Sequence, residues 1–244
     1  MTSPAFSDKV LPMRILGIET ATTTGSVAVM STDGLIAQYT LNIEVTHSER
    51  LMATVDRVLT DARLTLADID GLAVSIGPGS FTGLRVGLST VKGLALATNK
   101  PVAAVPTLRA LAWNSACSAR SVCPLLDARK KEVYAALFRF DGKEMAQTMA
   151  ETAISLEGLA VALKEETVFI GEGARLYRRE LTALLGDRAL FAPFSVGVPS
   201  AASVAELGIA MLAKGEAVDP DSLTPLYIRR PEAEVAWEKK QRSQ

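Results

Sequence analysis

The order of predicted elements is repeated in the two halves of this 244-residue chain. Each half opens with short apolar runs and an Asp-Gly pair, Asp33-Gly34 or Asp141-Gly142, which is typical of a two-residue hairpin turn. An amphipathic helix and a compact apolar strand follow, and the two strands end in Ile76-Gly77 and Ile170-Gly171. The repeat predicts two α/β domains of like topology, each a hairpin-led mixed sheet covered by helices.

The apolar periodicity places these elements along the chain. In the first half we expect strands at 14–20, 25–31, 35–42 and 71–76 and helices at 46–62, 84–98 and 107–116. In the second half we expect strands at 121–128, 132–140, 143–152 and 167–173 and helices at 156–165, 174–186 and 200–215. Thr46 and Glu49 form a capping-box pattern at the first helix, and Gly215 is a C-cap candidate for the last. The expected organisation is an unstructured extension at 1–13, domains at 14–112 and 113–228, and an extended tail at 229–244.

Scarce residue types limit the chemistry. The chain has one histidine, His47, and two cysteines, Cys117 and Cys123, so a zinc site of four His and Cys ligands would need nearly all of them. With 26 basic and 27 acidic side chains, the composition gives no footprint for nucleic acid, and we expect any such role to be shared with a partner. No apolar run is long enough for a membrane span, and the N-terminus is a poor signal peptide, so a cytoplasmic location is expected.

The segment GPGSFTGLRVG, residues 77–87, follows a strand and opens a helix. In this position the backbone N–H groups of Gly77, Gly79 and Ser80 could hold an anion at the helix N-terminus. The spacing matches neither a dinucleotide fingerprint nor a Walker A motif, and a tight turn built for packing is the favoured alternative. Gly83, Gly87 and Gly93 lie within the helix, where glycine is unfavourable, and they indicate a surface that another backbone approaches closely.

Two polar turns have a functional and a structural interpretation each. In IETATTTGS, residues 18–26, Glu19 and the following hydroxyls could hold a phosphate or a metal, or the threonines could satisfy their own backbone. The charged run 127–132 is most simply a solvated surface turn and could otherwise contact a partner. No Ser-His-Asp or Cys-His arrangement is indicated, because His47 stands at a helix start and no G-x-S-x-G motif is present.

Five segments are distinctive in combination: RILGIETATTTGSVAV, the helix that begins at His47, GPGSFTGLRVGLSTVKGLALATNKPVAAVPTL, LLDARKKEVYAALF and PLYIRRPEA. Together they resemble the bacterial TsaB family, also called YeaZ and historically labelled glycoprotease-like, from Arg14 to about Ala233. The resemblance implies the ASKHA fold of actin, Hsp70 and sugar kinases, which consists of duplicated ribonuclease H-like domains. Two departures are the 1–13 extension and Glu19, where an Asp is common in the family.

The resemblance also implies a role. TsaB looks like a degenerate paralogue of TsaD, which transfers a threonylcarbamoyl group to the adenosine beside the anticodon in tRNAs that read codons beginning with A. Two metal-binding histidines of TsaD correspond here to Thr107 and Leu111, which implies no catalytic metal, no cofactor of its own and no enzymatic activity. The expected function is that of a scaffold and activator. The alternatives are an ATPase or small-molecule kinase of the ASKHA class and, less favoured, a metallopeptidase.

The expected partners follow from the same family. They are TsaD, in a heterodimer formed through the first two helices of each protein, and the ATPase TsaE, with tRNA reached only indirectly and a homodimer when TsaD is absent. The resemblance places nine residues at this interface: Leu51, Met52, Val55, Val58, Leu59, Gly83, Gly87, Val91 and Leu94. A nucleotide, ATP or ADP, is expected at the junction with TsaD, with five candidate contacts: Glu19, Thr20, Gly77, Gly79 and Ser80. The structural alternative is that the apolar stripe faces the domain's own sheet.

Overall fold

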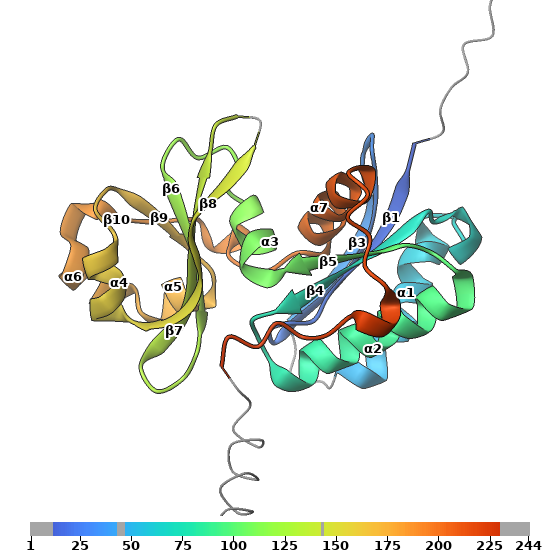
Figure 1. Ribbon diagram of the computed structural model, residues 1–244, viewed down its shortest axis with the longest axis horizontal. Coiled ribbons are helices and arrows are strands. Elements are labelled where there is room, and N and C mark those ends of the chain that lie inside the picture. Colours follow the sequence, from blue (N-terminus) through green and yellow to red (C-terminus); the bar gives the residue numbers. More distant parts are fainter. Residues whose placement is uncertain (1–11, 43–46, 143, 230–244) are drawn as a thin grey trace, which may run out of the picture.

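Each half of the chain forms a five-stranded mixed sheet with the same strand order (Figure 1). The structure is a computed structural model that describes residues 12–42, 47–142 and 144–229. Thr46 of the predicted capping box lies outside the described residues, and the side chain of Glu49 is not described either. The first sheet has the order β3-β2-β1-β4-β5, with β1, β2 and β3 antiparallel and β4 and β5 parallel to β1. Its elements are β1 (Arg14–Glu19), β2 (Thr24–Ser31), β3 (Gly34–Asn42), α1 (His47–Asp61), η1 (Leu66–Asp68), β4 (Gly71–Gly77), α2 (Phe81–Thr98) and β5 (Val102–Pro106).

The second sheet repeats this arrangement with the order β8-β7-β6-β9-β10. Its elements are β6 (Ser121–Asp127), β7 (Glu132–Phe140), β8 (Met145–Ser155), α4 (Leu156–Ala162), β9 (Thr167–Ile170), α5 (Glu172–Leu176), α6 (Arg178–Leu185), η2 (Gly186–Arg188) and β10 (Ala189–Phe191). An antiparallel meander followed by two parallel strands is the ribonuclease H-like sheet, and its duplication is the ASKHA architecture. The expected fold class is confirmed.

Two helices are exchanged between the lobes. The helix α3 (Thr107–Trp113) follows the first sheet, yet Leu108 and Leu111 pack in the apolar cluster of the second. The helix α7 (Ala201–Ala213) follows the second sheet and the short η3 (Phe194–Val196), yet it packs with Ile15 and Ala73 on the first. The division at 112/113 is therefore corrected: residues 201–228 lie with the first lobe, and α3 closes the second. Figure 1 shows α3 and α7 between the two sheets.

Close packing explains why α7 can cover β1. A Cβ on Gly17 would lie 2.3 Å from the backbone oxygen of Ala201, and a Cβ on Gly208 would lie 2.5 Å from the side-chain Cβ of Ala73. Glycine at both positions thus lets the helix approach the sheet closely. On the opposite face, α1 and α2 bury the other side chains of the same strands. The first lobe is a sheet between two helical layers.

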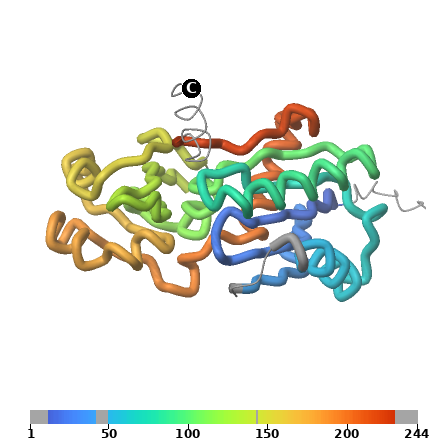
Figure 2. Tube along the Cα trace, turned by 90° about the horizontal axis from the view of Figure 1, so that it is seen from below, coloured from blue at the N-terminus to red at the C-terminus, as the bar shows by residue number. Residues whose placement is uncertain are grey.

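A C-terminal strap, residues 218–229, crosses from the first lobe to the second. Val218 bridges to Val102, η4 (Pro220–Ser222) lies against α2, and the Leu226 N–H donates to the Ile76 carbonyl at 2.7 Å. Figure 2 shows the strap passing along α2. After the single turn of η4, residues 223–229 form neither helix nor strand, whereas residues 230–244 of the expected tail and 1–11 of the expected extension lie outside the described residues.

Several elements differ from the sequence expectation, and three of these differences have a clear physical reason. The helix expected at 84–98 begins at Phe81, because the Ser80 side chain caps it by accepting the Gly83 N–H. The helix expected at 174–186 is divided into α5 and α6 at Tyr177, whose hydroxyl donates to Asp127 Oδ1 at 2.9 Å. The short strand β10 was not expected, since three residues are too few to show a periodicity.

Candidate functional site

The loop after β1 and the turn before α2 form one packed junction. The Ser80 N–H donates to the Ala21 carbonyl at 2.6 Å, and a Cβ on Gly79 would lie 2.2 Å from that oxygen. The Thr20 hydroxyl donates to the Gly83 carbonyl at 2.8 Å. The five residues expected at an anion site are thus brought together, but the polar groups of Thr20 and Ser80 bind the protein's own backbone. These contacts favour the packing interpretation of the GPGSFTG turn.

Glu19 is the exception within this junction. Its side chain is fully buried, and Oε1 accepts the Ala21 N–H at 2.5 Å. Burial raises the pKa of Glu19 to about 7, against the smaller lowering effects of the Ala21 N–H and the nearby Ser75 hydroxyl. Ser75 is nonetheless outside hydrogen-bonding geometry, since Glu19 Oε2 and Ser75 Oγ have no partner among the described residues. A carboxyl group that is buried and half protonated near neutral pH is poorly suited to bind a metal ion that accompanies a phosphate.

A cavity of about 340 Å³ lies where the two lobes meet. Thr23 and Thr24 line it from the first lobe, and the ends of β9 and β10 line it from the second. Charged residues also line the cavity. Arg178 lies over the Phe191 ring, 4.2 Å from its centroid. The pKa of Glu172 is raised by burial and, to a smaller extent, by the negative charge of Asp127. Sequence reasoning missed this cavity because its walls come from distant parts of the chain and carry no local motif.

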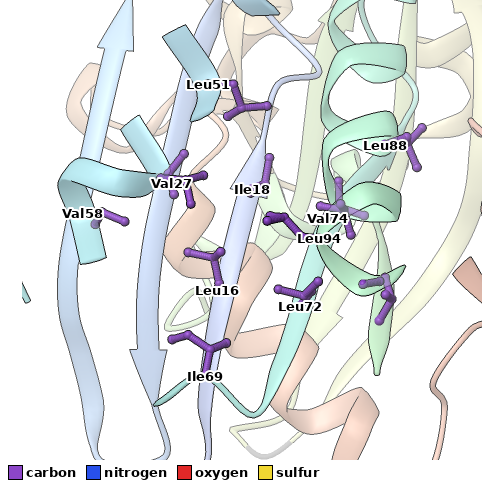
Figure 3. Close-up of a cluster of buried hydrophobic side chains, with 14 of the residues drawn as sticks. Leu16, Ile18, Val27, Leu51, Val58, Ile69, Leu72, Val74, Leu88 and Leu94 are labelled. Atoms are coloured by element: carbon purple, nitrogen blue, oxygen red, sulfur yellow. The ribbon is translucent and has the colours of Figure 1, made fainter. Parts of the chain in front are cut away.

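The apolar stripe expected at the partner interface faces the core of the first lobe instead. Figure 3 shows Leu51, Val58 and Leu94 directed at the strands. Eight of the nine residues are buried: Leu51, Val55, Val58, Leu59, Gly83, Gly87, Val91 and Leu94. These eight residues therefore pack as the structural alternative expects, because helical periodicity identifies an apolar face without identifying what covers it. Met52 is the ninth residue, and it is 51% exposed.

The outer face of α1 and α2 carries other apolar groups. Leu96 is 70% exposed, and a Cβ on Gly93 would meet nothing within 4 Å. The three residues Met52, Gly93 and Leu96, together called the outer α1/α2 face below, belong to two helices that contact each other. They leave a surface that is partly apolar and partly bare backbone.

The turn between β6 and β7 has an unusual backbone. Arg129, Lys130 and Lys131 have φ values of 60°, 54° and 62°, which is the left-handed region for all three. For residues other than glycine this conformation costs roughly 1–2 kcal/mol each. The turn is closed by hydrogen bonds between Ala128 and Glu132 and between Glu132 and Arg129. Such strain is most often kept at positions that have a function.

Comparison with known proteins gives a consistent result. A family model described as "TsaD: tRNA N6-adenosine threonylcarbamoyltransferase" matches residues 35–237. The chain is 31% identical over 228 residues to the "tRNA threonylcarbamoyladenosine biosynthesis protein TsaB" of Bacillus subtilis, covering 92% of this chain and 98% of that protein. The Escherichia coli protein of the same name is 32% identical over 93% of this chain and 98% of its own length. The chain belongs to the TsaB family.

A solved structure agrees with this placement. YeaZ from Pseudomonas aeruginosa superposes with a TM-score of 0.76 at 29% identity, over 88% of this chain and 99% of that one. TsaB-family relatives of this kind are named for tRNA threonylcarbamoyladenosine biosynthesis, and a role in that pathway is the coarse functional conclusion. No described helix is long and apolar enough to cross a bilayer.

Two positions have a specific meaning within the TsaB family. Thr107 and Leu111, which the family resemblance aligns with the histidines of TsaD, are both fully buried in α3, and Thr107 is its first residue. Thr107 Oγ1 accepts the Gly77 N–H at 3.1 Å, and a Cβ on Gly171 would lie 2.9 Å from Leu111 Cδ2. Thr107 thus fixes the start of α3 to the end of β4, and Leu111 packs the helix against the second lobe. Among the described residues no group of three His, Cys, Asp or Glu side chains is placed to bind a metal.

Proposed function

We propose that this chain is a non-catalytic scaffold and activator subunit for threonylcarbamoylation of the adenosine beside the anticodon, in tRNAs that read codons beginning with A. It acts by forming a heterodimer with TsaD, and TsaE joins the assembly in the cytoplasm. The observation that carries the proposal is the similarity to proteins named TsaB over 98% of the length of the Bacillus subtilis relative.

The packing at α3 supports the non-catalytic assignment. A metal site at the TsaD position would need side chains with ligand atoms aimed at a common point. Thr107 instead accepts a backbone N–H, and Leu111 packs against Gly171. Neither replaces an imidazole, so on this proposal the chemistry belongs to TsaD.

The outer α1/α2 face supports docking through these two helices. Met52 and Leu96 project from the lobe, where they are 51% and 70% exposed. Gly93 presents bare backbone on α2, three residues before Leu96, which allows a facing helix to approach closely. The same face accounts for a homodimer when TsaD is absent, because an isologous contact pairs one surface with itself.

The interlobe cavity favours a second candidate, an ATPase or small-molecule kinase, because a cleft between two lobes lined by Arg175 and Arg178 could take an anionic ligand. In the first proposal, by contrast, ATP or ADP binds at the junction with TsaD, and the chain has no cofactor of its own. ATP hydrolysis by the isolated chain would favour the second candidate. Stoichiometric zinc or iron would be needed for the metallopeptidase alternative.

Docking is tested by changing exposed residues only. Met52→Asp with Leu96→Asp places two charges on the outer α1/α2 face, and we expect copurification with TsaD to fall at least tenfold without a change in melting temperature. The matched control is Val161→Asp with Leu176→Asp, two exposed apolar residues of the second lobe. Wild-type copurification of the Met52/Leu96 variant would contradict the placement of the interface.

A further inference from the structure

A cluster of positive charge lies on the β6–β7 turn, away from the outer α1/α2 face. Arg129, Lys130 and Lys131 are all exposed, and the left-handed backbone holds three consecutive cationic side chains on one tight turn. The salt bridges identified among the described residues involve neither Arg129 nor Lys131. The chain as a whole has a net charge of −1, so the overall composition does not reveal this local cluster of positive charge.

The strap connects this turn to an aromatic group on α2. Arg229 forms an ion pair with Glu132 and donates to the Ala128 carbonyl at 3.3 Å, which places the end of the strap against the turn. Two residues earlier, the Tyr227 ring stacks on Phe81 with centroids 5.7 Å apart. Figure 1 shows the strap ending beside the β6–β7 hairpin.

An arginine completes this aromatic group. Arg85 lies over the Phe81 ring at 3.8 Å and donates to the Tyr227 hydroxyl at 3.2 Å. Phe81 remains 37% exposed, so a large apolar ring is kept at the surface beside Arg85. The basic-aromatic strip consists of Phe81, Arg85, Arg129, Lys130, Lys131, Tyr227 and Arg229.

We propose that the basic-aromatic strip binds the phosphate backbone of the tRNA substrate directly. Clustered Lys and Arg side chains bind phosphates through charge, and exposed rings beside them stack on unpaired bases. Aromatic and arginine side chains are also frequent in protein interfaces, so an acidic protein surface is the alternative that the test below decides. We take RNA as the occupant because the proposed function acts on tRNA, although the net charge predicted only indirect contact. The inference rests on the proposed function and names a contact that this chain itself contributes.

The test separates charge from folding. Asn is uncharged and tolerates the left-handed conformation, so Arg129→Asn, Lys130→Asn and Lys131→Asn together should leave the turn intact. The control is Arg63→Asn, Arg179→Asn and Lys214→Asn, which removes three exposed cations elsewhere. Each protein, alone and assembled with TsaD, is titrated with a labelled, unmodified tRNA transcript over a range of salt concentrations.

We expect the turn variant to bind tRNA at least tenfold more weakly than the control variant. For this variant, the slope of log K plotted against the logarithm of the salt concentration should be smaller in magnitude by about 2 to 3, roughly one for each lost phosphate contact. Phe81→Leu should weaken binding severalfold without changing that slope, because it removes a ring and no charge.

Equal tRNA affinity of the turn and control variants would overturn the inference. So would loss of TsaD copurification by the turn variant with unchanged tRNA affinity of the isolated chain, which would assign the strip to a protein contact. If the chain fails to assemble with TsaD at all, the proposed function fails, and the titration of the isolated chain still decides whether the strip binds RNA.

Discussion

At the scale of single residues, Glu19 shows what burial does to a side chain that looks functional in the sequence. A carboxylate among hydroxyls suggests a phosphate or metal site, but Glu19 is fully enclosed and its Oε2 has no described partner. Whether a polar residue is open to ligand depends on the loops packed over it. Here the turn of residues 77–80, which packs against Ala21, comes from a distant part of the chain, so this outcome could not be predicted from the residues around Glu19.

The buried carboxyl predicts an unusual dependence of stability on pH. Because its pKa is about 7 in the folded protein and 4.5 ordinarily, the folded state binds more protons between these values. The contribution of Glu19 to stability therefore falls as the pH rises from about 4.5 to 7, and its full cost, about 3 kcal/mol, applies above pH 7. Glu19→Gln should raise the melting temperature at pH 8 and have little effect at pH 5.

Thermal unfolding of Glu19→Gln and the wild-type protein across this pH range checks the prediction. Glu172→Gln is a useful comparison, since burial also raises the pKa of Glu172, whose side chain is only partly buried. A wild-type stability that increased steadily between pH 5 and pH 8, with no difference from Glu19→Gln, would contradict the account of this residue.

At the scale of elements, periodicity predicted most helices and strands but not their neighbours. The apolar stripe on α1 was correctly identified as an amphipathic face, and the same pattern serves a sheet or a partner equally well. Burial decides between them: Val55 and Val58 are 2% and 0% exposed against the lobe's own strands. The glycines of α2 show the same ambiguity, because Gly87 faces Thr20 inside the lobe and Gly93 faces solvent.

This difference gives a paired prediction for α2. In Gly87→Ala the new Cβ would lie 2.3 Å from Thr20 Oγ1, so the Thr20–Gly83 hydrogen bond must be displaced and the protein should lose about 1–3 kcal/mol of stability. In Gly93→Ala the Cβ meets open space, and the better helix propensity of alanine should add up to about 1 kcal/mol.

Chemical denaturation of the two variants measures these changes. The same Gly93→Ala protein should copurify less well with TsaD, because its methyl group fills the approach path of a facing helix. Equal loss of stability in both alanine variants would mean that the assignment of inner and outer glycines is incorrect.

At the scale of the whole molecule, the repeat of elements correctly predicted the duplicated fold but not the exchange of α3 and α7. A repeat shows that two sheets are alike, whereas the helix that covers each sheet is fixed by contacts across the lobes. Asn114 is one such contact: its amide donates to the carbonyls of Val196 and Val198, both at 2.9 Å, and accepts from Ser203. Apart from Gly208, the local sequence of α7 does not indicate which of the two sheets the helix packs on.

The exchange predicts that the first lobe does not fold as residues 14–112. Without α7, the face of its sheet that contains Ile15, Ala73 and Ala103 would be open to water, which exposes a large apolar area. We expect this fragment to be unfolded or aggregated by circular dichroism and gel filtration, and a synthetic 199–228 peptide to restore its folding. A cooperative thermal transition for the 14–112 fragment alone would contradict the corrected lobe boundary.

The central claim is that this chain activates a transferase whose chemistry it does not perform. The most direct measurement is the rate of threonylcarbamoyladenosine formation on tRNA by TsaD and TsaE, supplied with threonylcarbamoyl-adenylate, with and without this chain. The account predicts that modification requires the wild-type chain and is restored by the Val161/Leu176 control but not by Met52→Asp with Leu96→Asp. Modification at an unchanged rate when the chain is left out would contradict the account.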